Sequence, residues 1–555
     1  MIGFPSERPF RAWPRHRFSP AMASRGMVAA AHPLTVAAGL DILQRGGNAV
    51  EAAVAAALTA AVVMPEMCGV GGDLFAIVQR PGEAPLSFLG SGRSPASATI
   101  EQMRRHADQT PGGPRMPLRG ALAASVPGLP GAVEAMLARY GAGLGLADLA
   151  AAAIGHAEHG FPLTPFGAAA IKMCEGFLKT NAAAAAVYLP GGSAPIPGHL
   201  LRQPDLARIL RGLVSEGLES FYTGALANRI GDAVAKAGGA LSAADLAAHT
   251  TPAEPPISTT YRGVSAHQTG LPTQGLILLE ALNIIQQAPA ELVARNDAAS
   301  VHLQAEALKR AYADRLAYAR DPDFGATPMA ALLSNAFAAR RFASIDPHRA
   351  SDEVAPALAD GDTTYLCVVD EAGMMVSLIL SVSSAFGSGV VAGDTGILLN
   401  NRVGRGFSLE DGHPNRFEPG KRTMHTLNCY LLSDAAGVPI AVGGTPGGDG
   451  QPQWNLQTLV ALIDSGLDVQ AAVEAPRWTV WPGTDPHDLP APYELRVETR
   501  LGGPVLDGLE ALGHRLQRTG AWGGSGAAQL IVRDPVTGVM AGGSDPRVEG
   551  LALGF

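Results

Sequence analysis

A pair of threonines at positions 363 and 364 is the feature of this 555-residue chain that could do chemistry most directly. The pair follows Gly361-Asp362 and opens an apolar run that ends near Val369. If the chain were cut before Thr363, this residue would carry both a hydroxyl nucleophile and a free α-amine able to accept its proton. An α-amine has an ordinary pKa of about 8, so part of it is unprotonated at neutral pH. The alternative is an ordinary strand start, because threonine favours β-structure.

A second candidate is the glycine-rich loop Pro446-Gly447-Gly448. It lies between a strand predicted for Pro439 to Val442 and a helix predicted for Leu456 to Ile463. Backbone N–H groups that precede a helix can stabilise a negative charge, which is what an oxyanion hole requires. The alternative reading of this loop is a plain turn.

The elements around these two candidates have the pattern of a sheet covered by helices. The run from Thr364 to Val369 and the run from Met375 to Leu380 are joined by Asp370-Glu371-Ala372-Gly373, which predicts a hairpin. Cys429 to Leu432 and Pro439 to Val442 form a second predicted pair. Upstream, residues 33–63 predict two buried Ala-rich helices, and residues 69–73 form a glycine loop before a strand over residues 74–78. This order predicts a layered fold of helices and sheets.

The middle of the chain, residues 115–330, is predicted to be mostly helical. One segment, His302 to Tyr318, has the pattern of an amphipathic helix whose polar side is expected to face solvent. That polar side carries Lys309, Arg310, Asp314 and Arg315. Residues 327–362 are more polar and predict an exposed loop.

Composition excludes several classes of protein. Hydrophobic residues make up 47% and charged residues 16% of the chain, so it can bury enough apolar surface to fold. The net charge of −9 comes without a concentrated basic stretch, so we expect no nucleic-acid partner. No apolar run is long enough to span a membrane, and residues 1–26 lack the apolar core of a secretory signal, so we expect a cytoplasmic protein without a membrane partner.

The cysteine and histidine residues give no metal pattern. The four cysteines are far apart and form no C-x-x-C pair, which favours reduced, buried thiols. We therefore expect no metal and no organic cofactor, since attack by a threonine needs neither.

Ten short motifs occur in order along the chain and together resemble one family. They lie at residues 26–33, 46–53, 69–72, 126–128, 307–315, 363–365, 386–389, 396–401, 446–448 and 544–547. The chain resembles the gamma-glutamyltransferase family of N-terminal-nucleophile hydrolases, and the likeness runs from about Gly26 to Phe555.

The resemblance implies an α+β fold, a four-layer αββα sandwich, made as a proenzyme that cleaves its own Asp362–Thr363 bond. The products would be a large fragment 1–362 and a small fragment 363–555, held together as one heterodimer, with a dimer of such units left open. Thr363 would be the nucleophile and its α-amine the base. The N–H groups of Gly447 and Gly448 would form the oxyanion hole.

Two serines stand where the family supports the nucleophile. The family's threonine hydroxyl, also needed for self-cleavage, is replaced by Ser381, and its asparagine two residues later is replaced by Ser383. Both replacements keep a short hydrogen-bonding group, and the resemblance implies site roles for both. The alternative is that they are ordinary strand serines.

The implied substrate pocket departs from the family pattern. Members that use glutathione hold the ammonium of the γ-glutamyl group with acceptors at the positions of Arg402 and Arg405. Guanidinium groups cannot accept hydrogen bonds and would repel an ammonium, whereas they attract a carboxylate. We therefore expect a γ-glutamyl donor to bind badly.

Other carboxylate-binding positions also differ. Paired serines of the family correspond to His425 and Thr426, and an arginine of the family aligns with Ser91, two residues before Arg93. We expect Arg93, His425 and Thr426 to bind substrate, although His425 could instead be a core histidine.

Together these changes favour an amide substrate that carries a carboxylate, such as oxamate. Residues 72–75 and 445–451 resemble the branch of the family that contains oxamate amidohydrolase and cephalosporin-acylase-like proteins. Three alternatives stay open: glutathione hydrolysis or γ-glutamyl transfer, a glutaryl-type acylase, and an uncleaved, inactive relative.

Overall fold

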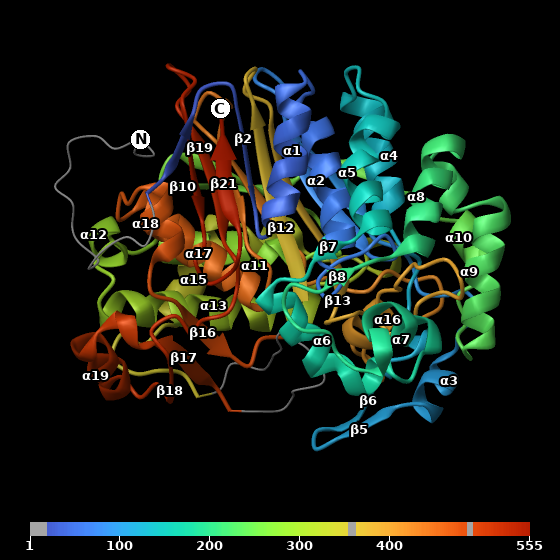
Figure 1. Ribbon diagram of the computed structural model, residues 1–555. Helices are drawn as coiled ribbons and strands as arrows, with labels where there is room; N and C mark the ends of the chain where they lie inside the picture. Colours follow the sequence, from blue (N-terminus) through green and yellow to red (C-terminus); the bar gives the residue numbers. More distant parts are fainter. Residues whose placement is uncertain (1–18, 353–361, 485–491) are drawn as a thin grey trace.

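Two seven-stranded β-sheets face each other in the part of the chain described by a computed structural model, residues 19–352, 362–484 and 492–555. Helices cover the outer face of each sheet (Figure 1). The four-layer αββα sandwich expected from the sequence is therefore confirmed.

The first sheet, here called the β12 sheet, has the strand order β21-β2-β12-β13-β3-β4-β9. Its strands are β21 (Leu551–Gly554), β2 (Gly26–Ala30), β12 (Asp362–Asp370), β13 (Met375–Ser383), β3 (Asp73–Gln79), β4 (Leu86–Gly90) and β9 (Ala253–Glu254). The second, the β15 sheet, has the order β1-β20-β19-β15-β14-β11-β10. Its strands are β1 (Ala21–Ala23), β20 (Met540–Ser544), β19 (Gln529–Arg533), β15 (Pro439–Gly444), β14 (Cys429–Ser433), β11 (Val264–Gln268) and β10 (Ile257–Tyr261).

Three smaller groups of strands lie outside the sandwich. They are β5 (Asp108–Thr110) with β6 (Gly113–Arg115), β7 (Phe161–Pro162) with β8 (Leu200–Leu201), and the sheet of β16 (Trp478–Trp481), β17 (Glu494–Glu498) and β18 (Leu516–Thr519).

The helices divide between the two outer layers and the sides of the sandwich. Those on the side of the β12 sheet include α1 (Pro33–Gln44), α2 (Ala49–Val63), α4 (Leu129–Tyr140), α5 (Leu146–His159) and α8 (Pro204–Glu216). Those on the side of the β15 sheet include α11 (Gly275–Ile285), α13 (Ala298–Tyr318), α15 (Asn335–Ala343), α17 (Gly450–Ile463) and α18 (Val469–Glu474). The others are α3 (Ile100–Arg105), α6 (Pro165–Leu178), α7 (Ala182–Tyr188), α9 (Gly224–Lys236), α10 (Ala243–Ala247), α12 (Ala290–Val293), α14 (Met329–Leu332), α16 (Arg402–Gly406) and α19 (Gly503–Ala511).

Alternation along the central strands separates two apolar layers. On β3, Phe75 and Ile77 pack between the sheets, whereas Leu74 and Ala76 pack against the helices. The same alternation on β12 sends Tyr365 to the space between the sheets. Odd-numbered residues at the end of these strands therefore point into the layer between the sheets.

Several predicted elements are confirmed. The β12–β13 hairpin turns at Asp370, the predicted helices within residues 33–63 are α1 and α2, and β14 pairs with β15. The Ala-rich α2 is buried along its whole length against β12 and β13, which its small side chains allow.

Other expectations were wrong. The helix over residues 302–318 exists as part of α13, but its polar side does not face solvent, because Lys309, Arg310, Asp314 and Arg315 are all buried in ion pairs. The polar segment from residue 327 contains α14 and α15 rather than a continuous loop, and its residues 353–361 lie outside the described part. Strands β10 and β11 were not predicted.

Each of the two sheets contains strands from both sides of Thr363. In the β12 sheet, β12 and β13 lie between β2 and β3, which come from the first half of the chain. In the β15 sheet, β14 pairs with β11 and β20 pairs with β1. Neither part of the chain could complete a sheet alone.

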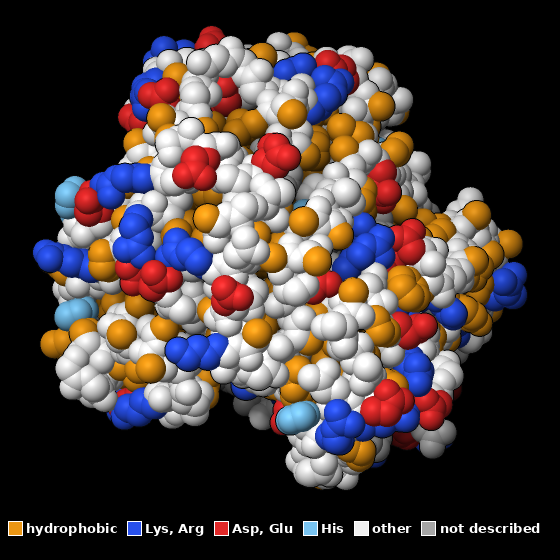
Figure 2. Space-filling model, turned by 90° about the vertical axis from the view of Figure 1, so that its right-hand side faces the viewer, with side chains coloured by type: hydrophobic (Ala, Val, Ile, Leu, Met, Phe, Trp, Pro, Cys, Tyr) orange, Lys and Arg blue, Asp and Glu red, His pale blue; other side chains and the backbone are white. Residues whose placement is uncertain are grey.

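Charged side chains of both signs are interspersed over the face that Figure 2 shows, without a band of one sign. Among the described residues, no helix combines the length and the apolar character needed to cross a bilayer.

Candidate active site

Thr363 lies one residue inside β12, in the centre of the β12 sheet, and is 1% exposed. Its Oγ1 donates a hydrogen bond to Ser381 Oγ on β13, with 3.2 Å between the oxygens. The register of the two strands shifts between Asp362 and Thr364, which is a bulge or a similar irregularity next to the candidate nucleophile. A bulge bends a strand and re-aims a side chain, which suits a residue that must act rather than only pack.

Polar side chains continue from this pair across neighbouring strands. Ser381 lies directly opposite Asp73 in the β13–β3 pairing, so both side chains share one face of the sheet. Ser91, just after β4, makes a 2.5 Å hydrogen bond between its Oγ and His425 Nε2. Polar groups thus replace the apolar layer at this end of the space between the sheets.

Ser383 has a strained backbone, with φ at +90°. Its N–H donates to Ser381 Oγ at 2.7 Å, and its carbonyl oxygen accepts from Arg405 Nη1 at 3.0 Å. Its own buried Oγ has no hydrogen-bond partner among the described residues. The turn therefore fixes the Ser381 hydroxyl and leaves the Ser383 hydroxyl available for a ligand.

Arg402 and Asp73 form a buried ion pair beside these serines. Arg402, on the short helix α16, is 2% exposed, and its Nε donates to Asp73 Oδ2 at 2.7 Å. Burial raises the pKa of Asp73 to about 6 although the Arg402 charge opposes the shift. The arginine predicted to bind substrate is therefore held by a carboxylate that sequence reasoning did not assign to the site.

His425 is fully buried against the ring of Phe75, with ring centroids 4.9 Å apart. Burial, and then the charges of Arg402, Arg422 and Arg315, lower its pKa well below the ordinary value, so the ring is neutral at neutral pH. Its Nδ1 lies 3.9 Å from Asp73 Oδ2 and has no hydrogen-bond partner among the described residues. His425 thus lies in the candidate site next to Asp73.

The loop of Gly447 and Gly448 joins β15 to α17, as predicted. Gly444, at the end of β15, lies against the ring of Tyr365, two residues beyond Thr363, so the loop starts where β12 begins. Gly447 and Gly448 have φ of +121° and +51°. A Cβ on Gly447 would lie 2.1 Å from Trp454 Cζ3, so the position needs glycine.

Gln274 holds this loop from the side of the β15 sheet. Its Nε2 donates to the carbonyl oxygen of Gly448 at 2.8 Å and to that of Thr426. The N–H groups of Gly447 and Gly448 donate no hydrogen bond to any described residue. Two N–H groups without a partner among the described residues are what an oxyanion hole requires, and the assignment of this role to the loop stays a prediction.

The remaining predicted binding residues differ in their placement. Thr426 is buried, and its Oγ1 lacks a partner among the described residues. Arg93 is 36% exposed and donates to Asp323 Oδ2 at 2.5 Å and to the carbonyl oxygen of Gly420 at 2.8 Å. Its role in binding stays a prediction, and substrate would have to compete with these partners. The side chain of Asp362 lies outside the described part.

Sequence reasoning missed Asp73 and Gln274 as parts of the site. Asp73 belongs to the segment 72–75 that resembles the branch, but it was given no role there, and its partner Arg402 is 329 residues away. Gln274 gave no sequence signal, because it is a single polar residue just before a mostly apolar helix.

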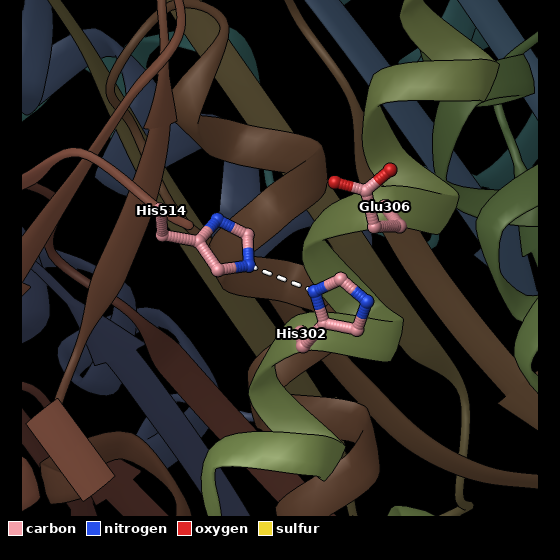
Figure 3. A group of neighbouring side chains, drawn as sticks. All are labelled: His302, Glu306 and His514. Atoms are coloured by element: carbon pink, nitrogen blue, oxygen red, sulfur yellow. Dashed lines mark hydrogen bonds between the residues drawn. The ribbon is translucent and has the colours of Figure 1, made fainter. Parts of the chain in front are cut away.

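A second cluster, His302, Glu306 and His514, brings together side chains of the types that bind metals (Figure 3). His302 Nδ1 and His514 Nε2 lie 2.9 Å apart in a hydrogen bond, and His302 Nε2 donates to the carbonyl oxygen of Asp346. Both oxygens of Glu306 already accept hydrogen bonds, from Lys309, Arg310 and Ser351. Two neighbouring cations and a saturated carboxylate do not fit a metal ion, so this cluster is a structural network.

Comparisons with known proteins agree with this fold. A family model described as gamma-glutamyltranspeptidase matches residues 35–555. The chain is 36% identical over 542 residues to the oxamate amidohydrolase proenzyme of Klebsiella pneumoniae, covering 96% of this chain and 99% of that protein. It is 35% identical over 537 residues to the glutathione hydrolase-like YwrD proenzyme of Bacillus subtilis, covering 96% and 99%.

Among solved structures, cephalosporin acylase from Bacillus halodurans matches with a TM-score of 0.90 and 35% identity, covering 99% of both chains. The fold is that of the N-terminal-nucleophile hydrolases. Within that class, the chain belongs to the gamma-glutamyltranspeptidase family. The predicted family and the predicted branch are thus confirmed.

Proposed function

We propose that this chain is a self-cleaving amidohydrolase that uses Thr363 as its nucleophile and hydrolyses the amide of a small substrate carrying a carboxylate. The observation that carries the proposal is the buried contact of Thr363 Oγ1 with Ser381 Oγ, at the start of a central strand. Cleavage before Thr363 would place an α-amine within the same residue as that hydroxyl.

The reaction follows from these groups. The α-amine takes the proton of Thr363 Oγ1, and the oxygen attacks the amide carbonyl of the substrate. The N–H groups of Gly447 and Gly448 hold the negative oxygen that forms. The C–N bond breaks, the amine leaves with the proton, and an ester to Thr363 remains. Water then attacks this ester, releasing the acid and restoring the hydroxyl.

Cleavage at Asp362–Thr363 would give fragments 1–362 and 363–555. We expect them to stay together as a heterodimer, because each sheet contains strands from both fragments. Separating them would expose the apolar layer between the sheets, which is unfavourable.

The proposed substrate class rests on charge and on the named relatives. Arg402 and Arg405 are both buried on α16, and Arg405 donates to the carbonyl oxygen of Ser383, so a carboxylate bound there would find positive charge and hydroxyl groups. Oxamate, the substrate in the name of the Klebsiella relative, carries a carboxylate next to its amide. A glutaryl amide, the second candidate, carries one farther away, and the match to a cephalosporin acylase favours including it.

The test is a hydrolysis panel on freshly purified protein. Ammonia release is measured from oxamate and from pyruvamide, in which a methyl group replaces the carboxylate, and nitroaniline release from glutaryl and γ-glutamyl anilides. We expect oxamate or the glutaryl anilide to be hydrolysed best and Thr363→Ala to abolish all activity. Preference for the γ-glutamyl anilide would contradict the substrate class, and activity in Thr363→Ala would contradict the nucleophile.

A further inference from the structure

The ion pair of Asp73 and Arg402 is made by one hydrogen bond where two are possible. Arg402 Nε donates to Asp73 Oδ2 at 2.7 Å. Arg402 Nη2 and Asp73 Oδ1 are both buried and have no hydrogen-bond partner among the described residues. A guanidinium and a carboxylate commonly pair through two parallel hydrogen bonds. Here one donor and one acceptor stay unpaired.

Two further unpaired groups lie next to this pair. His425 Nδ1 lies 3.9 Å from Asp73 Oδ2, and Ser383 Oγ belongs to the turn that also holds Ser381. A buried polar atom without a partner costs about 1–3 kcal/mol, so native structures contain few of them. These four atoms belong to residues around Ser381, which contacts the candidate nucleophile, and a polar ligand bound there would complete them.

We propose that Asp73 is a positioning residue for substrate recognition: by accepting a hydrogen bond from Arg402 Nε, it turns the Nη2 group of Arg402 toward the carboxylate of the substrate. This inference rests on the proposed function, because it assumes that the site takes a carboxylate. Asp73 acts through Arg402 and takes no part in the attack by Thr363.

The elements that carry Arg402 and Asp73 explain why a carboxylate on β3 is needed. Arg402 comes from α16, a helix of five residues, and α16 follows a loop rather than a sheet strand. Asp73 belongs to a central strand, opposite Ser381, and Ser381 contacts Thr363. A hydrogen bond from Asp73 therefore fixes the guanidinium relative to the nucleophile through the rigid sheet.

The loss of Asp73 should change carboxylate binding in opposite directions, depending on whether Asp73 acts only through its charge or positions Arg402. An experiment can therefore separate these two roles. Removing a negative charge near a carboxylate site should strengthen carboxylate binding if electrostatic attraction were all that mattered. If Asp73 positions Arg402, losing its oxygen should weaken binding despite the gain in positive charge. Asp73→Asn keeps an acceptor oxygen and removes the charge, whereas Asp73→Ala removes both.

The experiment compares these two variants with the wild type and with Asp464→Ala. Asp464 is a matched control because its Oδ1 also accepts from an arginine Nε, that of Arg262, at 3.1 Å and at the end of α17 away from Asp73. Binding of oxalate, the dicarboxylate left by oxamate hydrolysis, is measured by calorimetry. Intact mass establishes that each preparation has the same state of cleavage, and circular dichroism that it is folded.

We expect Asp73→Ala to bind oxalate about tenfold more weakly than the wild type, Asp73→Asn to stay within about threefold, and Asp464→Ala to match the wild type. Equal or tighter binding by Asp73→Ala would overturn the inference, as would a wild type that does not bind oxalate. If Asp73→Ala fails to fold, Asp73→Leu takes its place. A tenfold loss of oxalate affinity in Asp73→Leu, with an affinity near that of the wild type in Asp73→Asn, supports the inference. Unchanged oxalate affinity in Asp73→Leu overturns it.

Oxamate hydrolysis by the wild type is measured in parallel. Oxalate binding that depends on Asp73 without oxamate hydrolysis would contradict the proposed reaction and leave the inference standing. Oxamate hydrolysis with an unchanged KM in Asp73→Ala would contradict the inference and leave the proposed function standing.

Discussion

Thr363 and Ser381 place their hydroxyl oxygens 3.2 Å apart on adjacent antiparallel strands, where the register of the β12–β13 pair shifts. Ser381 Oγ also accepts the N–H of Ser383 at 2.7 Å. The turn at Ser383 thus orients Ser381, and Ser381 contacts Thr363, the candidate nucleophile.

This relationship predicts the effect of changing Ser381. Ser381→Ala should slow cleavage at Asp362–Thr363 by about tenfold or more, because the hydroxyl that contacts Thr363 is lost; tenfold corresponds to about 1.4 kcal/mol. Ser381→Thr keeps the hydroxyl and should cleave at a rate near that of the wild type. The time course of intact mass after expression measures both. Equal cleavage in all three proteins would show that Ser381 is an ordinary strand serine.

The proposed role of Arg402 in binding the carboxylate predicts how its loss would affect substrate discrimination. Arg402→Gln removes a charged hydrogen bond, worth about 2 kcal/mol, and should lower kcat/KM for oxamate by about thirtyfold. Hydrolysis of pyruvamide, which has no carboxylate, should change by less than threefold. The ratio of the two kcat/KM values is the measurement. An equal loss of kcat/KM on both substrates would mean that Arg402 supports the fold and does not recognise the carboxylate.

The oxyanion loop predicts a strong effect of a single methyl group. Gly447→Ala should lower kcat by about 10²–10³, because a Cβ would meet Trp454 at 2.1 Å and displace the N–H groups. Gly437→Ala is the control, since Gly437 has φ at +81° but no neighbour within 4 Å of an added Cβ. Similar kcat values in both variants would contradict the assignment of the loop.

The buried network around Glu306 should support stability. Burial alone would raise the pKa of Glu306, but Lys309, Ser351 and Arg310 lower it to about 2. Glu306→Gln leaves two buried cations without a counter-charge and should cost about 3 kcal/mol, seen as a lower thermal midpoint. Glu175→Gln, which loses ion pairs with the exposed Lys172 and Lys179, should lower the thermal midpoint much less, because water screens exposed ion pairs.

The pH dependence of this difference follows from the sign of the shift. A lowered pKa means that the ionised Glu306 stabilises the folded state above about pH 4.5, and that this contribution is lost as the pH falls toward about 2. The gap in thermal midpoint between the wild type and Glu306→Gln should therefore narrow over that range. A gap that does not change with pH would contradict the ionic role.

The sequence predicted features that depend on contacts between neighbouring residues, and it did not predict features that depend on contacts between distant residues. The β12–β13 hairpin depends on Asp370 and its neighbouring turn residues, so local chemistry was sufficient. The buried polar side of α13 was predicted wrongly, because a charged helix face looks the same whether water or distant side chains satisfy it. Asp314, for example, pairs with Arg341, and Arg315 with Asp449.

The site was predictable in part for the same reason. The family resemblance led to Thr363 and the glycine loop through short motifs, and to Ser381 through its aligned position. Asp73 became visible as a partner of Arg402 only when β3 and α16, far apart in sequence, were brought together. Likewise, Arg93 could not be known to pair with Asp323 from its position along the chain.

The central claim is that this chain cuts itself to expose Thr363, and intact-mass analysis with N-terminal sequencing tests it most directly. The account predicts two fragments that co-purify, the smaller one beginning at Thr363. A chain that stays at its full 57.0 kDa while it hydrolyses amides, or a small fragment that begins at another residue, would contradict it.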